Sequence, residues 1–387
     1  MKLFDVYPLY DVTPISAKGI EVRDEHGQTY LDFYGGHAVI SIGHSHPHYV
    51  NRMTEQLQKM TFYSNSIKNP LQGELGEKLG TLSNCEDYQL FLCSSGAEAN
   101  ENALKMASFH TNKAKVIAFK NSFHGRTSAA VATTDNPKIN APLNRQQLVD
   151  FVPLNDFEAF EKTISDGKHC AVILEAIQGV GGLDQPTTEF YQFVAQKCRG
   201  NKVVLIADEV QSGFGRSGQF FAFQHHGIQP DIISIAKGMG NGFPVGGVLI
   251  HNQFEPWYGQ LGTTFGGNHL ACVATLAVLE VLENESLIEN ATQSEAYFRE
   301  KASEVSKIKR VKGRGLMLGL EFDFEVSELR KNLIYQQHMF TGGSANKKLL
   351  RFLPALNITK AQIDLFFEGL SQELRKMSSP TKSKSMP

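Results

Sequence analysis

The sequence predicts an α/β protein, with a large domain built around a mostly parallel sheet and a smaller α+β domain after it. Between residues 88 and 250, short and almost continuously apolar runs alternate with Gly-rich or polar turns and helical patterns. Such runs are typical of strands that are covered on both faces. After Lys312 the apolar runs shorten, and the pattern ends in a helix from Lys360 to about Lys376. A chain of 387 residues with 41% apolar content can bury a large core.

The strands expected in the large domain share this apolar character. They are Tyr88–Cys93, Lys115–Phe119, Ala171–Leu174, Val203–Ala207, Ile232–Ala236 and Val245–Ile250. Residues 270–305 have a helical pattern of Leu and Val among Ala and Glu. Two shorter strand-like pieces, Leu316–Phe322 and Leu349–Leu353, then indicate the smaller domain.

Domain boundaries are expected where these patterns change. We assign residues 46–270 to the large domain and 271–377 to the small domain. Residues 1–45 form an N-terminal segment that packs with the small domain or crosses between subunits. Residues 378–387 are rich in Ser, Lys and Pro, which predicts a disordered tail.

Composition excludes several classes of function. A net charge of -2 gives no general electrostatic reason to bind nucleic acid or an anionic membrane. The five cysteines are scattered and never spaced C-x-x-C, so we expect no disulfide framework, no structural zinc and a reducing compartment. No signal-peptide core and no membrane-spanning stretch is visible, which predicts a cytoplasmic protein.

Two ionisable residues stand directly after predicted strands, where ligands bind in open α/β sheets. Asp208 follows Val203–Ala207, and a desolvated carboxylate there needs a cationic partner such as a protonated pyridine nitrogen. Lys237 follows Ile232–Ala236, where desolvation lowers the pKa of an amine and makes it nucleophilic. The alternatives are an Asp that caps the next helix and a Lys whose head reaches water.

Two further strand ends carry ligand-binding patterns. The stretch Ser94–Asn100 opens a helix with a Gly-containing turn, whose free N–H groups suit a phosphate; the alternative is an ordinary Ser-capped helix. In Phe123–Thr127, Phe123 offers a face for a planar ring and Arg126 a fork for a carboxylate. The alternative is a surface turn with a solvated Arg.

Other patterns are weaker. The stretch Gly213–Gly218 matches the dinucleotide fingerprint G-x-G-x-x-G, but it starts five residues past a strand end and opens no evident helix. The alternating His44, His46 and His48 suggest a metal, yet no acidic or Cys ligand clusters nearby in the sequence and Pro47 marks a turn. We therefore expect neither a nicotinamide cofactor nor a metal.

Together these segments resemble the class-III aminotransferases, which are fold-type-I pyridoxal phosphate enzymes, and most closely the acetylornithine/succinylornithine branch. The likeness runs from about residue 5 to residue 370. The motifs that carry it are Gly43-His44 to Pro47, Ser95–Ala99, Phe123–Thr127, Asp208–Gln211, Lys237-Gly238, Thr263–Asn268, Arg314-Gly315 and Leu350-Arg351.

The resemblance implies pyridoxal 5'-phosphate as cofactor and Lys237 as its Schiff-base partner, which later shuttles the substrate proton. The other implied cofactor contacts are Ser95, Gly96 and Ala97 with the phosphate, Phe123 with the ring face, Asp208 with the ring nitrogen, Gln211 with the phenolic oxygen, and Thr264 with the phosphate of a neighbouring subunit.

It also implies two substrates and a homodimer. Arg126 would hold the carboxylate of the amino donor, and Arg351 the carboxylate next to the reacting carbon of glutamate or 2-oxoglutarate. Thr263 would lie near the substrate of the neighbouring subunit, so that the active site is shared across the interface.

These roles point to transfer of the terminal amine of an N2-acylated ornithine, acetyl or succinyl, to 2-oxoglutarate in arginine biosynthesis. Alternatives are another class-III ω-aminotransferase acting on ornithine, 4-aminobutyrate or lysine, an aminomutase or decarboxylase, and a non-catalytic binding protein. Two positions depart from the family. Val180 stands where many relatives carry a Glu that pairs with the arginine matching Arg351, and His37 replaces a small apolar residue and offers a donor for a longer acyl group.

Overall fold

The computed structural model describes residues 1–378. The last helix, α11 (Lys360–Ser378), ends where the predicted tail begins, so residues 379–387 of that tail lie outside the described part.

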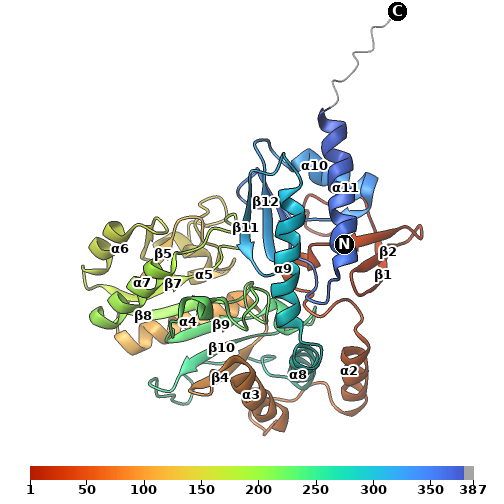
Figure 1. Cartoon of the computed structure of the whole chain (residues 1–387). Coiled ribbons are helices and arrows are strands. Elements are labelled where there is room, and N and C mark those ends of the chain that lie inside the picture. The colour runs from red at the N-terminus through yellow and green to blue at the C-terminus, as the bar shows by residue number, and fades with distance from the viewer. Residues whose placement is uncertain (379–387) are drawn as a thin grey trace, which may run out of the picture.

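A seven-stranded sheet forms the centre of the large domain (Figure 1). Its strands, in spatial order, are β4 (Tyr88–Cys93), β10 (Gly246–His251), β9 (Ile232–Ile235), β8 (Val204–Asp208), β7 (His169–Leu174), β5 (Lys115–Phe119) and β6 (Val149–Val152). Only β10 runs antiparallel to its neighbours. The predicted mostly parallel sheet is confirmed. Strand β6 was not predicted, because it is a four-residue edge strand interrupted by Asp150.

Both faces of this sheet are buried, as the apolar runs predict. Along β5, Ile117 and Phe119 point into one hydrophobic core, while Val116 and Ala118 point into a second core on the other face. This alternation follows from the two-residue period of a strand. Helix α4 (Gly96–Thr111) covers the second face with Ala, Leu and Met side chains.

Helices and short turns precede or connect these strands. They are α1 (Gly35–Ala38), α2 (Pro47–Lys59), α3 (Pro70–Ser83), α5 (Ser128–Ala132), η1 (Asn144–Gln146), α6 (Phe157–Ile164), α7 (Thr188–Asn201), η2 (Ala222–His226) and η3 (Lys237–Met239). The predicted helix over 270–305 is divided into α8 (His269–Asn284) and α9 (Leu287–Ser303), because Ser286 adopts a left-handed φ of 51° between them.

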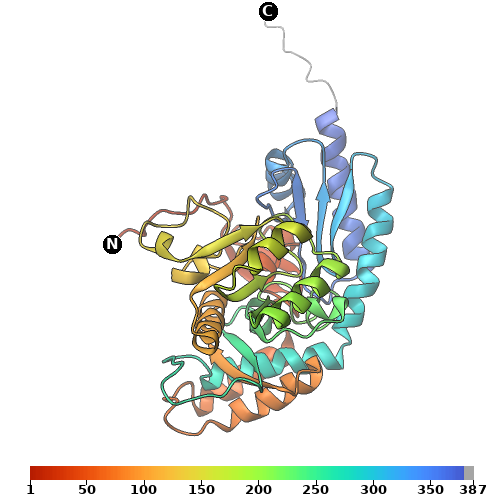
Figure 2. The ribbon, with the colours of Figure 1, turned by 90° about the vertical axis from the view of Figure 1, so that its left-hand side faces the viewer.

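The smaller α+β part contains two short sheets. One is antiparallel, in the order β11 (Arg310–Arg314), β12 (Met317–Glu321) and β14 (Leu349–Phe352). The other joins β1 (Pro14–Lys18), β2 (Glu21–Asp24) and β3 (Thr29–Asp32) to β13 (Met339–Phe340). Figures 1 and 2 show the β11–β12–β14 sheet and α11 standing to one side of the large sheet, with α9 running up to them. Helix α10 (Ser327–Gln337) packs against α11.

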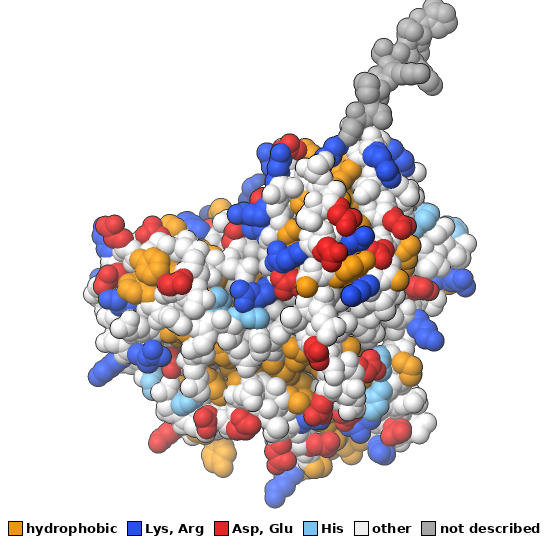
Figure 3. All heavy atoms as spheres, viewed as in Figure 1, with side chains coloured by type: hydrophobic (Ala, Val, Ile, Leu, Met, Phe, Trp, Pro, Cys, Tyr) orange, Lys and Arg blue, Asp and Glu red, His pale blue; other side chains and the backbone are white. Residues whose placement is uncertain are grey.

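The surface and the cysteines fit the composition. Lys, Arg, Asp and Glu are interspersed over the face shown in Figure 3. All five cysteines are buried and free. Within residues 1–378, no helix is long and apolar enough to cross a membrane.

Candidate active site

A cavity of about 360 Å³ opens at the carboxyl edge of the large sheet. It brings together eight of the predicted site residues, which come from four different strand ends: Ser95, Gly96, Ala97, Phe123, Arg126, Asp208, Gln211 and Lys237. Thr263, Thr264 and Arg351 do not line this cavity. The residues predicted from the ends of these four strands therefore line one cavity.

Asp208 is the last residue of β8 and is buried. Its Oδ2 accepts hydrogen bonds from Asn100 Nδ2 at 2.8 Å and from His124 Nδ1 at 2.7 Å, and its Oδ1 accepts one from the N–H of Val210 at 3.0 Å. A carboxylate has about four acceptor positions, so one remains for a donor in the cavity. The carboxylate is thus held in one orientation at the position expected for a partner of a ring nitrogen.

Lys237 follows β9 and is half-buried in the same cavity. Burial lowers the pKa of its amine, although the nearby Asp208 and Glu175 act in the opposite direction. Its backbone has a left-handed φ of 48°, which for a residue other than Gly costs on the order of 1 kcal/mol and is frequent at functional sites. These features suit a nucleophilic amine.

The start of helix α4 has the properties of a phosphate site. Ser95 Oγ accepts the N–H of Glu98 at 3.2 Å, and the Glu98 carboxylate reaches back to the N–H of Ser94 at 3.0 Å. Within residues 1–378, the N–H groups of Gly96 and Ala97 have no acceptor, and both residues line the cavity. A Cβ on Gly96 would lie 2.6 Å from Val210 Cγ1, so only Gly fits here. Free N–H groups at a helix N-terminus bind phosphate.

Glu175, which was not among the residues predicted from the sequence, also lines the cavity and holds the backbone of Phe123. Its Oε1 accepts the N–H of Phe123 and its Oε2 the N–H of Gly179, both at 2.9 Å. Burial raises the pKa of Glu175 to about 7. The residue follows β7 directly, so the rule that selected Asp208 and Lys237 also points to Glu175.

Arg126 lies at the exposed rim of the cavity, with its Cζ 6.0 Å from the ring centroid of Phe123. No ion pair within the described residues engages it. A guanidinium in this setting can bind a substrate carboxylate as a fork.

Arg351, on β14, is buried and hydrogen-bonded to neutral oxygen atoms. Its Nη1 donates to the carbonyl of Gly179 at 2.7 Å, its Nε to the carbonyl of Gly343 at 2.6 Å, and its Nη2 to the hydroxyl of Tyr34 at 3.0 Å. Val180, next to Gly179, leaves no carboxylate in this position. In place of the Glu that many relatives carry, two backbone carbonyls and the Tyr34 hydroxyl thus bind the Arg351 guanidinium.

Gln211 and His37 lie in the same neighbourhood. Gln211 Nε2 donates to the carbonyl of His37 at 3.0 Å, and Gln211 Oε1 lies 3.5 Å from Arg351 Nη1. The Nδ1 of His37 is 2.5 Å from the Tyr34 hydroxyl. The side chain of His37 is therefore paired with Tyr34.

Thr263 and Thr264 lie in the loop between β10 and α8. Thr263 Oγ1 accepts the N–H of Gly266 at 3.0 Å, and its carbonyl accepts Asn65 Nδ2 at 3.3 Å. Thr264 is exposed. Their expected roles concern a second subunit and stay predictions.

The weaker sequence patterns have structural explanations. Within Gly213–Gly218, the buried Arg216 donates to the backbone carbonyls of Leu316, Pro354 and Ile40, so this loop is tied to the small sheet. No helix begins there, as a dinucleotide site would require.

The three alternating histidines do not converge. They pair with three different carboxylates: His44 with Asp32, His46 with Glu285 and His48 with Glu280. Among the described residues, one group has metal-ligand spacing, namely Asp150, Asp166 and His169. The ammonium of Lys115 already bridges its two carboxylates, at 2.5 and 3.2 Å.

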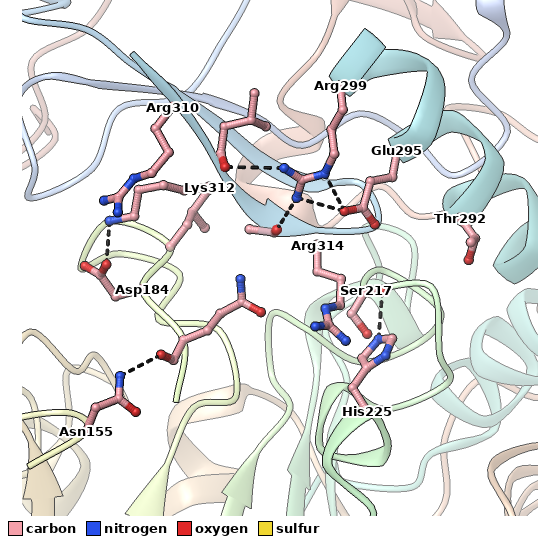
Figure 4. A pocket seen from close by; sticks show the side chains of 14 residues that line it. Asn155, Asp184, Ser217, His225, Thr292, Glu295, Arg299, Arg310, Lys312 and Arg314 are labelled. Carbon is pink, nitrogen blue, oxygen red and sulfur yellow. Dashed lines mark hydrogen bonds and ion pairs between the residues drawn. The ribbon is translucent and has the colours of Figure 1, made fainter. Parts of the chain in front are cut away.

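A larger cavity of about 740 Å³ lies elsewhere, between α9, β11 and loops of the large domain (Figure 4). Its basic residues are mostly paired: Lys312 with Asp184 at 2.6 Å, and Arg299 with Glu295 at 2.8 Å and the carbonyl of Gly313 at 2.7 Å. It contains none of the predicted site residues, so volume does not identify the active site here.

The fold and the cavity together define a fold-type-I pyridoxal phosphate aminotransferase. An amine of lowered pKa, an oriented carboxylate and two free N–H groups at a helix start fit the aldehyde, the ring nitrogen and the phosphate of that cofactor. The chain belongs to the class-III aminotransferase family, whose sequence model, Aminotransferase class-III, matches residues 7–374. Enzymes of this family use pyridoxal 5'-phosphate and take an amino donor and a keto acceptor.

Relatives agree with this assignment. The chain is 39% identical to the acetylornithine aminotransferase of Bacillus subtilis, covering 96% of this chain and 97% of that protein. It is 39% identical to the Aquifex aeolicus enzyme of the same name, with 94% and 96% covered. Among solved structures, an ornithine aminotransferase from Toxoplasma gondii superposes with a TM-score of 0.88 at 27% identity, covering 95% and 92% of the two chains. Another structure of that enzyme holds PLP at partial occupancy.

Proposed function

We propose that this aminotransferase moves the terminal amine of an N2-acylated ornithine to 2-oxoglutarate. The products are the acylated glutamate semialdehyde and glutamate, as in arginine biosynthesis. The observation that carries the proposal is the pair of separate arginines, an exposed and unpaired Arg126 at the rim and a buried Arg351 behind it. Two different carboxylate-binding groups, Arg126 lining the cavity and Arg351 in contact with the lining residue Gln211, suit two different substrates. Relatives of about 37–39% identity carry the name acetylornithine aminotransferase.

The chain's own residues divide the chemistry between them. Bound pyridoxal phosphate supplies an electron sink for the substrate carbon. Lys237 holds the cofactor and then moves a proton between substrate and cofactor carbons, a task that requires an amine of lowered pKa. Asp208, fixed by Asn100 and His124, keeps a negative charge next to the ring nitrogen. Gly96 and Ala97 bind the phosphate through N–H groups.

Acylation of the donor fits the charges at the rim. If Arg126 binds the α-carboxylate, the α-nitrogen lies next to a guanidinium that has no acidic partner within the described residues. A free ornithine would place a second positive charge there. Two like charges about 4 Å apart cost roughly 1–4 kcal/mol at an exposed to half-buried site. An N2-acyl group removes this charge.

A homodimer completes the proposal. Several large apolar side chains are exposed in the loop that carries Thr264 and in the segment that contacts it: Phe62, Tyr63 and Phe265. The rings of Phe62 and Phe265 stand 5.4 Å apart, and Asn65 ties the two segments together. Exposed apolar surface of this kind is typical of a subunit interface. We place the dimer in the cytoplasm, where free buried cysteines stay reduced.

Steady-state kinetics with 2-oxoglutarate test the donor. N2-acetylornithine, N2-succinylornithine, ornithine, 4-aminobutyrate and lysine are compared by kcat/KM. We expect at least one acylated ornithine to exceed free ornithine by about tenfold or more, because of the charge at the rim. Failure with both acylated donors, together with turnover of ornithine, 4-aminobutyrate or lysine, would replace this proposal with the ω-aminotransferase alternative.

A further inference from the structure

We propose that Tyr34 and His37 form a fixed, neutral brace that positions the Arg351 guanidinium for the acceptor's carboxylate, in place of an acidic partner. Both are positioning residues, because they act through Arg351. The inference rests on the proposed function, since it takes Arg351 as the group that binds glutamate and 2-oxoglutarate.

The partners of the Arg351 guanidinium are all neutral. All three nitrogens of its guanidinium donate to uncharged oxygens, namely two backbone carbonyls and the Tyr34 hydroxyl. No ion pair within residues 1–378 involves this side chain. Its positive charge is therefore available to an incoming carboxylate without first displacing a protein carboxylate.

Tyr34 accepts a hydrogen bond from Arg351 and donates one to His37. Arg351 can only donate, so the Tyr34 oxygen accepts from it at 3.0 Å. The phenol proton is then directed to His37 Nδ1, 2.5 Å away. Partial burial, together with the charges of Arg351, Lys237 and Arg330, lowers the pKa of the partly exposed His37 to about 4, which favours the neutral ring that can accept. A phenol that donates to an imidazole becomes a stronger acceptor for the guanidinium.

Several contacts hold the Tyr34 side chain in place. A Cβ on Gly342 would lie 2.2 Å from Tyr34 Cε2, so the ring is packed directly against that backbone. The ring also faces the Arg351 guanidinium at 5.5 Å and the His37 ring at 4.8 Å. Asp32 Oδ1 accepts the N–H of Tyr34 at 2.9 Å. These contacts hold the Tyr34 ring against Gly342, Arg351 and His37, while its remaining edge borders a cavity of about 690 Å³.

His37 lies in a left-handed stretch of backbone. Gly35 and Gly36 have φ of 55°, and His37 and Ala38 follow with 69° and 63°. This left-handed turn is unfavourable for the two residues other than Gly and persists only if the surroundings hold it. It aims the His37 carbonyl at Gln211 Nε2 (3.0 Å) and the imidazole at Tyr34. Gln211 Oε1 in turn lies 3.5 Å from Arg351 Nη1, so His37 is linked to the guanidinium through Gln211 as well as through Tyr34.

The test compares the two half-reactions of Tyr34→Phe and wild-type holoenzyme. Glutamate and an N2-acylornithine are titrated separately, and the bleaching of the absorbance band of the lysine-bound cofactor is followed. Loss of the hydroxyl leaves a buried guanidinium N–H without its acceptor. We expect the apparent dissociation constant for glutamate to rise about tenfold or more, and that for the acylornithine to stay within about twofold.

Two further variants control this experiment. Tyr297→Phe removes a hydroxyl that donates to Asp364 away from the cavity, and both half-reactions should stay unchanged. His37→Asn keeps a residue that tolerates the left-handed backbone but removes the imidazole that accepts from Tyr34. It should weaken glutamate binding in the same direction by about threefold, because the hydroxyl remains.

The outcomes separate the brace from the proposed function. Equal losses in both half-reactions, or unchanged or tighter glutamate binding in Tyr34→Phe, overturn the brace; tighter binding would make the phenol a competitor of the substrate. A wild-type enzyme whose band does not respond to glutamate overturns the proposed function and the brace with it. A selective loss toward glutamate in both Tyr34→Phe and His37→Asn supports it.

Discussion

Replacing Lys237 with Ala is expected to lower the transamination rate by at least about 10³-fold, because among residues 1–378 no other amine lines the cavity to hold the cofactor and move the proton. The folded protein should be as stable as wild type or more stable, since the change removes an amine that burial disfavours in its charged form. Turnover with 2-oxoglutarate and thermal unfolding are the two measurements. Some cofactor should still bind through Asp208 and the helix start.

Lys331→Ala is the matched control for this prediction. Lys331 is exposed on α10, and its removal should leave both the rate and the unfolding temperature unchanged. A Lys237→Ala protein that keeps more than a few per cent of the wild-type rate, alongside an unaffected control, would contradict the assigned role.

Asp208→Asn is expected to lower the rate by about 10²-fold to 10³-fold and the free energy of unfolding by about 1–3 kcal/mol. The substitution keeps the shape but removes the charge next to the ring nitrogen. In either amide orientation the NH₂ group faces a donor, because Asn100 and His124 approach one oxygen and the Val210 N–H the other. Turnover and denaturant unfolding measure the two effects.

Asp231→Asn separates the loss of stability from the loss of rate. Asp231 also accepts two hydrogen bonds next to the same strands, from the Leu205 N–H at 2.8 Å and from Gln253 Nε2 at 2.7 Å, but it does not line the cavity. It should lose stability with little change in rate. Similar rates for the two variants would show that the charge of Asp208 has no part in the chemistry.

Local pattern was enough to predict the sheet and most of the cavity. Apolar runs bounded by turns are short-range features, and β4 and β5 begin and end at the predicted residues. The convergence of Asp208 and Lys237 then follows from parallel strands ending at one edge. The same rule, applied to β7, would have found Glu175. The four-residue β6 gave too short a signal.

The contacts of Arg351 were beyond the reach of local pattern. Its hydrogen bond to Tyr34 joins residues 317 positions apart, and it depends on a left-handed turn whose sequence signal is only the pair Gly35-Gly36. Val180 indicated that a carboxylate was missing, but not what replaces it. The polar partners of a buried charge depend on tertiary packing. The periodicity of hydrophobic residues predicts helices and strands but not these long-range contacts.

The absorbance spectrum of the purified holoenzyme tests the central claim most directly. We expect a band of the lysine-bound cofactor near the visible edge that bleaches when an N2-acylornithine is added and returns when 2-oxoglutarate follows. A protein that takes up no pyridoxal phosphate, or a band that neither acylated donor bleaches, would contradict it.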